Sequence, residues 1–63
     1  MDILILGANG MLGPAVIEAL QSNHRLRLTD INDLETQHEY LKVDVSSLDQ
    51  VVQAARGMDA IIN

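Results

Sequence analysis

The chain has 63 residues, of which 48% are hydrophobic and 21% charged, and its formal net charge is −5. This is a globular composition, but a domain of such length buries only about 60% of its unfolded surface, so we expect the first part of a longer domain. The acidic balance disfavours nucleic-acid and anionic-membrane partners. Without cysteine, and with His24 and His38 isolated, disulfides and a metal site are not expected.

The first element expected is a strand over residues 3–6, which are all large and apolar. Such a run without alternation indicates burial on both faces, as in a central parallel strand. A helix is expected to begin near Gly10 or Met11, with Pro14 in its first turn, where no hydrogen bond is lost. Its apolar stripe consists of Leu12, Ala15, Val16, Ala19 and Leu20.

Residues 25–30 predict a second strand that alternates polar with apolar side chains and ends at Asp30. Residues 39–43 predict a short third strand, half polar, that suits a sheet edge. Residues 31–38 between them show no sustained period and are expected to be a loop. This connection is short, because parallel strands usually need a crossover of about a dozen residues.

A second helix is expected after Ser47, which forms a capping box with Gln50. Gly57 is placed to end this helix, and residues 59–63 predict a fourth strand in which Ala60, Ile61 and Ile62 are buried. The helix carries an apolar stripe of Leu48, Val51, Val52 and Ala55. The resulting order predicts an α/β fold: the first half of a doubly wound parallel (Rossmann) sheet, strand order 3-2-1-4, with residues 1–63 part of one domain.

Three glycines spaced three apart join the first strand to the first helix. No Lys or Arg lies nearby, so a phosphate here would be held by backbone N–H groups and the helix dipole. Gly7 lets the chain leave the strand sharply, Gly10 removes a Cβ from the path of a pyrophosphate, and Gly13 allows close packing of the helix. The spacing and the missing Lys exclude a P-loop. The alternative is a turn that merely joins strand to helix.

Asp30 stands at the end of the second strand, about 20 residues beyond the glycines. In a dinucleotide-binding fold, an acid at this place accepts hydrogen bonds from the adenosine ribose. Its charge would repel a 2′-phosphate, and no Arg follows closely to offset it, so NAD is favoured over NADP. The alternative is an ordinary acidic strand end or an Asx-turn.

The glycine run with Asp30, Asp44-Val45 and the closing Asp59 to Asn63 resembles the N-terminus of the NAD-dependent epimerase/dehydratase family, the extended short-chain dehydrogenases/reductases. The resemblance implies that the backbone at residues 9–12 faces the pyrophosphate, and that Asp44 bonds the adenine amino group with Val45 beside it. For Asp44 and Val45, the residues alone equally allow a strand end followed by a buried apolar side chain. The implied cofactor-binding residues are Gly7, Asn9, Gly10, Met11, Leu12, Gly13, Asp30, Ile31, Asn32, Asp44 and Val45.

The catalytic Tyr-x-x-x-Lys of that family is absent, so no catalytic residue is expected within the chain. Tyr40 is the only tyrosine, the residue four positions on is Asp44, and we expect Tyr40 to serve packing. The acidic Met1-Asp2 and the four-residue apolar run that follows do not form a signal peptide, so a cytoplasmic protein is expected by default. The resemblance implies that the full-length protein is an oxidoreductase, epimerase or dehydratase acting on a small-molecule or sugar-nucleotide substrate, with a homodimer as a candidate assembly. The alternatives are a non-catalytic dinucleotide sensor and a truncated product that does not fold.

Overall fold

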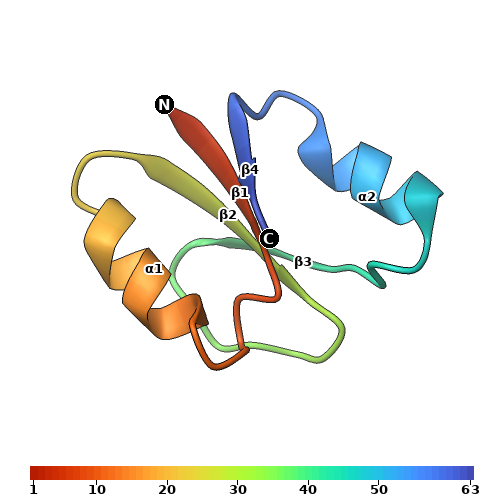
Figure 1. Ribbon diagram of the computed structural model, residues 1–63, viewed down its shortest axis with the longest axis horizontal. Helices are drawn as coiled ribbons and strands as arrows, with labels where there is room; N and C mark the ends of the chain where they lie inside the picture. Colours follow the sequence, from red (N-terminus) through yellow and green to blue (C-terminus); the bar gives the residue numbers. More distant parts are fainter.

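Six elements follow one another in the computed structural model, which describes residues 1–63 (Figure 1). All strands are parallel, in the order β3-β2-β1-β4, which confirms the predicted α/β sheet. The connection rules for parallel strands account for this order: the first helix leads to the strand beside it, and the second helix returns the chain past two strands to the open side of the first strand. The elements are β1 (Asp2–Leu6), α1 (Gly13–Leu20), β2 (Arg25–Asp30), β3 (Glu39–Lys42), α2 (Leu48–Ala55) and β4 (Ala60–Ile62).

Strand β1 forms the centre of the core and is buried on both faces, as predicted. Ile3 and Ile5 pack on the face covered by α1, together with Leu26 and Leu28 of β2. Leu4 points to the opposite face, where it packs with Val43 and with Ala54 of α2. Figure 1 shows the two helices on opposite sides of the strands. A strand covered on both faces explains why apolar residues follow one another without alternation.

The connection between β2 and β3 is short and contains no helix. The two strands pair only from Arg27 with Glu39 to Asp30 with Lys42. The chain therefore has to return over only about 10 Å of strand length before β3 begins. Residues 31–38 cover this distance, and the half-buried Leu34 packs against the core on the way. The limited pairing of an edge strand thus resolves the conflict with the usual crossover length.

Arg27 ties β2 to the end of α2, a contact that the sequence pattern did not suggest. Its side chain is only 15% exposed, and its Nε donates to Glu39 Oε1 at 2.9 Å. Its Nη1 donates to the carbonyl oxygens of Ala54 at 2.6 Å and Arg56 at 2.8 Å. The last carbonyls of a helix lack intrahelical partners and carry partial negative charge, so a guanidinium satisfies them well. Gly57 follows with a φ of +77°, as predicted for a glycine that ends a helix.

Helix α1 begins later than expected, at Gly13, with Leu12 as its N-cap. The residues before it form two consecutive turns instead of helix, because the amide of Gly10 bonds the carbonyl of Gly7 and the amide of Gly13 bonds that of Gly10. The predicted stripe is therefore wrong in part. Leu12 is 74% exposed, while the residues facing the sheet are Gly13, Val16, Ile17 and Leu20.

The predicted face of α2 and the burial of β4 are also wrong in part. Leu48 is 75% exposed and Val52 50%, because the helix turns Val51, Ala54 and Ala55 to the sheet. Ile61 is 52% exposed, since β4 pairs with β1 on one side and has no strand on the other. The N-cap is as predicted, with Ser47 Oγ accepting from the Gln50 amide at 3.4 Å. The reciprocal half of the capping box is missing, because Gln50 Oε1 accepts from the Asp44 amide instead.

Neither helix has the length and apolar character needed to cross a membrane.

Candidate functional site

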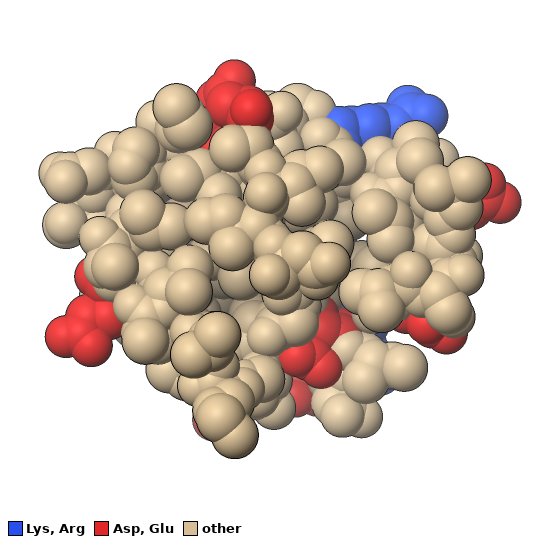
Figure 2. Space-filling view, in the orientation of Figure 1, with Lys and Arg blue, Asp and Glu red and all other residues tan.

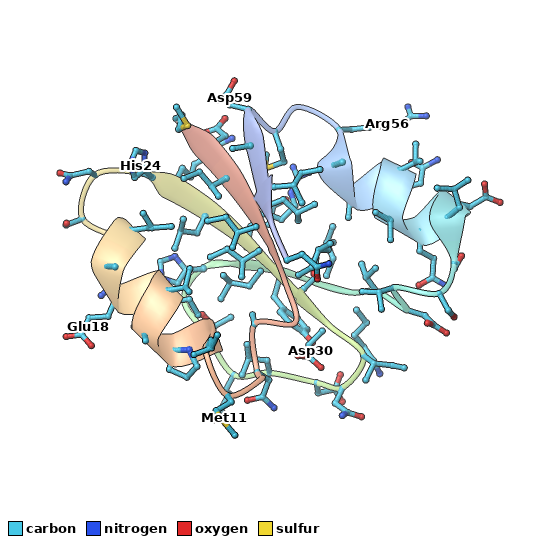
Figure 3. The ribbon with its side chains drawn as sticks, in the orientation of Figure 1. Met11, Glu18, His24, Asp30, Arg56 and Asp59 are labelled. Carbon is cyan, nitrogen blue, oxygen red and sulfur yellow. The ribbon has the colours of Figure 1, made fainter.

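The carboxyl ends of the strands meet at one edge of the sheet, where the glycine turn lies. β1 ends at Leu6, which pairs with Thr29, so Gly7 and Asp30 follow at the same level. In Figure 3, Met11 and Asp30 lie at this lower end, whereas His24, Arg56 and Asp59 lie at the opposite end. Ligands of open α/β sheets bind outside the carboxyl ends of the strands. This edge is therefore the candidate site.

The turn itself is shaped by Gly7 and Gly13. Gly7 has a φ of +72°, the left-handed conformation that glycine adopts without strain, and it lets the chain leave β1 sharply. At Gly13, an added Cβ would lie 1.8 Å from the carbonyl oxygen of Ala8 and 2.5 Å from its carbonyl carbon. The start of α1 thus packs directly on the backbone that follows β1. The close packing expected at Gly13 is present, with the turn itself as the partner.

Backbone donors face outward at the start of α1. The amides of Met11 and Leu12 donate to no acceptor of the protein, and no side chain caps the helix. Helix N-termini attract anions because unpaired N–H groups and the helix dipole act together. A cavity of about 420 Å³ opens beside these residues, lined among others by Gly7, Gly10 and Asn63. The arrangement can hold a phosphate without any basic side chain.

Asp30 connects the end of β2 to the glycine turn. Its Oδ2 accepts the Asn9 amide at 2.9 Å, and its Oδ1 accepts the Ile31 amide at 2.7 Å. The Asn9 hydrogen bond is the main cause that lowers the pKa of Asp30 below its usual 3.8, with smaller contributions from the Ile31 and Asn32 amides against some desolvation. The side chain is half-buried and negatively charged at neutral pH. A carboxylate has further lone pairs, so it can also accept hydrogen bonds from a ligand.

A second hollow of about 190 Å³ lies beside Asp30, and it brings together residues that are far apart in sequence. Its lining consists of Gly7, Asp30, Ile31, Val43, Asp44 and Val45. Five of these are residues that the sequence predicted as cofactor-binding; Val43 was missed, although its place between the end of β3 and Asp44 could have suggested it. Asn9 and Asn32 border the hollow's residues, but their side chains are exposed. The structure thus gathers the predicted adenosine-binding positions on one side of the glycine turn.

Asp44 begins a turn that leads into α2. Its Oδ1 accepts from the amide of Ser46 at 2.9 Å and from its hydroxyl at 2.6 Å, and these bonds, the hydroxyl's first, lower the pKa of Asp44. Its other carboxylate oxygen makes no hydrogen bond within the protein, so it can accept from a ligand. Val45 is 63% exposed and therefore contradicts the alternative of a buried apolar residue after the strand end.

The hollow beside Asp30 is acidic, whereas the hollow beside the glycine turn is lined by no charged side chain. Asp30 and Asp44 line the smaller one, and no Lys or Arg lines either. The nearest cation along β3, Lys42, places its Nζ 3.3 Å from Asp33 Oδ1. Figure 2 shows that the main basic area on the face it presents lies at the upper right, where Figure 3 labels Arg56, at the end remote from the turn. A ligand with an extra phosphate beside Asp30 would face this carboxylate in a hollow that no Lys or Arg lines.

Two larger hollows of about 450 Å³ each lie elsewhere, one between β3 and α2 and one at the amino ends of β2 and β3. No residue of the glycine turn lines either of them, although Val43 lines both the first and the hollow at Asp30. Their volume exceeds that of the hollow at Asp30, but neither offers the outward-facing amides of Met11 and Leu12 beside the Asp30 carboxylate. Chemistry, not volume, therefore marks the carboxyl edge as the candidate site.

Comparison with solved structures finds the same arrangement in dehydrogenases. A uronate dehydrogenase from Agrobacterium tumefaciens matches 95% of this chain with a TM-score of 0.84 and 30% identity. A glucuronic acid dehydrogenase from Chromohalobacter salexigens matches 98% with a TM-score of 0.83 and 30% identity. The chain therefore has the fold of part of a dehydrogenase Rossmann domain. A mutated uronate dehydrogenase gives a TM-score of 0.81, also at 30% identity, over 95% of the chain.

The chain spans about a quarter of the length of these structures, between 23% and 25%. No protein-family model matches the sequence, and a search of curated proteins finds no match. The structural likeness supports a Rossmann-type oxidoreductase segment of the short-chain dehydrogenase/reductase superfamily, as the sequence predicted. It does not single out one family within that superfamily.

Proposed function

We propose that the chain is the NAD-binding segment of an oxidoreductase and that it holds the adenosine and pyrophosphate of the cofactor. The observation that carries this proposal is the hydrogen bond from the Asn9 amide to Asp30 Oδ2, at 2.9 Å. It joins the glycine turn, which suits a pyrophosphate, to the carboxylate that suits a ribose. One connected site therefore offers both kinds of recognition that a dinucleotide requires.

The residues present fit such a cofactor. The free amides of Met11 and Leu12 would bind the pyrophosphate, and Asp30 would accept from the ribose hydroxyls, with Ile31 and Asn32 beside it. The remaining carboxylate oxygen of Asp44 would accept from the adenine amino group, and exposed Val45 offers an apolar contact to the base. The bound nicotinamide supplies the hydride acceptor. Residues 1–63 orient the cofactor and contribute no proton donor.

The substrate class is inferred from the structural neighbours, of whose length this chain spans about a quarter. Because two of those neighbours are uronate dehydrogenases and a third is a glucuronic acid dehydrogenase, a sugar acid is the first substrate class to test, ahead of sugar nucleotides. A non-catalytic dinucleotide sensor is the second candidate, since the glycine turn and Asp30 would serve it equally well. A Tyr-x-x-x-Lys in sequence that follows residue 63 would decide for the enzyme.

Calorimetric titration with NAD and NADP tests the proposal. We expect NAD to bind at least about tenfold more tightly, because the 2′-phosphate of NADP would approach Asp30 and no cation lines the hollow to offset the repulsion. Titration with ADP should give a similar preference over adenosine 2′,5′-bisphosphate, which carries the same additional charge. Equal or tighter binding of NADP would contradict the proposed cofactor.

A further inference from the structure

Tyr40 does more than pack against the core. Its ring lies beside Leu28, its partner in β2, and is half-buried with the residues that α1 covers. Its hydroxyl reaches the end of β2, where it donates to the carbonyl oxygens of Asn32 and, at 3.3 Å, of Asp30. A residue needed only for packing has no use for this hydroxyl, since phenylalanine would fill the same space.

The two carbonyl groups are held unequally by the rest of the protein. The carbonyl of Asp30 also accepts the Val43 amide at 2.8 Å and so belongs to the β2–β3 pairing. The carbonyl of Asn32 accepts only from Tyr40, and the side chains of Ile31 and Asn32 are exposed. A hydroxyl carries one proton, so it serves one carbonyl at a time. The hydrogen bond from the Tyr40 hydroxyl to the Asn32 carbonyl therefore holds the backbone that follows Asp30.

We propose that Tyr40 is a positioning residue for the adenosine half of the site, which it serves by holding the backbone of residues 30–32 through its hydroxyl. The proposal rests on the proposed NAD-binding function. Without the hydrogen bond from Tyr40, Ile31 and Asn32 would move in the ligand-free protein and would have to be ordered when the ribose binds. That ordering lowers affinity, because immobilising a loop costs free energy.

The charges around Tyr40 keep its hydroxyl a donor. Burial, followed by the negative charges of Asp30 and Asp33, raises the pKa of Tyr40, while Lys42 opposes this only in part. The phenol is therefore protonated throughout the neutral range. The same surroundings argue against proton transfer by Tyr40, because a catalytic tyrosine needs a lowered pKa and a nearby Lys at the right spacing.

The test is Tyr40→Phe in the full chain, measured by NAD titration and by backbone ¹⁵N relaxation without ligand. We expect NAD to bind about three- to tenfold more weakly, because the variant loses one hydrogen bond. The order parameters of the Asn32 and Asp33 amides should fall from about 0.85 toward 0.6, while those of Gly10 and Gly13 stay unchanged. Thr36→Val is the matched control, since it removes a hydroxyl that accepts the His38 amide in the same connection. It should change neither quantity.

A second measurement avoids any effect of the substitution on folding. A fluorinated tyrosine at position 40 ionises at lower pH, so NAD binding should weaken as this hydroxyl loses its proton, while the ordinary chain shows no change over the same range. Unchanged NAD affinity and order parameters in Tyr40→Phe, or a flat pH profile with the fluorinated residue, would overturn the role of Tyr40 alone. If the unaltered chain binds no NAD, the proposed function fails as well, and the two failures are thereby distinguished.

Discussion

The Gly13→Ala variant is expected to lose about 3 kcal/mol of folding free energy, the upper end of the cost of overpacking. The added Cβ would lie 1.8 Å from the Ala8 carbonyl oxygen, and backbone atoms on both sides leave no flexible side chain to move away. Relief requires α1 to shift from the sheet. For a domain of this length the total stability is about 3 to 9 kcal/mol, so the loss is a large part of it. Urea unfolding followed by circular dichroism measures it.

Two other glycines provide matched controls for this prediction. At Gly57 an added Cβ meets nothing within 4 Å, so Gly57→Ala should cost only the left-handed conformation, about 1 kcal/mol. At Gly10 the added Cβ lies 3.1 Å from the Gly7 carbonyl oxygen, a contact that a small shift relieves, so Gly10→Ala should fall between the two. A Gly13→Ala chain as stable as Gly57→Ala would show that the helix does not pack on the turn as described.

Asp30→Ala is expected to weaken NAD binding by about 10- to 100-fold, because hydrogen bonds to a charged group are the stronger ones. The change removes the acceptor for the ribose and also releases the Asn9 and Ile31 amides. NADP should lose less affinity than NAD, since the repulsion of its 2′-phosphate disappears at the same time. Parallel calorimetric titrations of both cofactors give the ratio.

The controls for Asp30 separate charge from geometry. Asp30→Asn keeps one acceptor oxygen and should give an intermediate loss of NAD affinity, whereas Asp33→Ala, with a side chain 90% exposed, should leave NAD binding unchanged.

The lowered pKa of Asp30 also predicts a dependence of stability on pH. The ionised carboxylate stabilises the fold above the ordinary pKa of 3.8, and this stabilisation is lost only as the pH falls through the lower pKa of the folded chain. The Asn9 amide resonance should therefore shift below pH 3.8 in the unaltered chain only. Discrimination between NAD and NADP that survives Asp30→Ala would rule out its proposed role.

The sequence was sufficient to predict the sheet because its decisive signals are local. The buried run of β1, the alternation of β2 up to Asp30 and the Ser47 cap each depend on neighbouring residues, and the strand order then follows from connection rules. The positions of Gly7 and Asp30 at one edge were predictable for the same reason. Parallel strands that start in register also end together.

What the sequence could not predict depends on contacts between distant residues. The amphipathic pattern of α1 includes Leu12, but the turns held by Gly10 and Gly13 delay the helix and leave Leu12 exposed. Arg27 looks like an exposed strand residue, and only the position of α2 over β2 gives its guanidinium two carbonyl partners. Tyr40 was expected to serve packing. The path of residues 31–38 brings the Asn32 carbonyl to the Tyr40 hydroxyl, and no sequence signal predicts that path.

Titration of the ¹⁵N-labelled chain with NAD tests the central proposal most directly. The proposed site predicts saturable shifts of the amides of Met11, Leu12 and Gly13 together with those around Asp30 and Asp44, at NAD concentrations where NADP causes smaller changes. Amides lining the hollow between β3 and α2, such as those of Leu41 and Gln53, should stay unchanged. Saturable shifts at that hollow without shifts at the glycine turn, or no shifts at any concentration of NAD, would contradict the proposal.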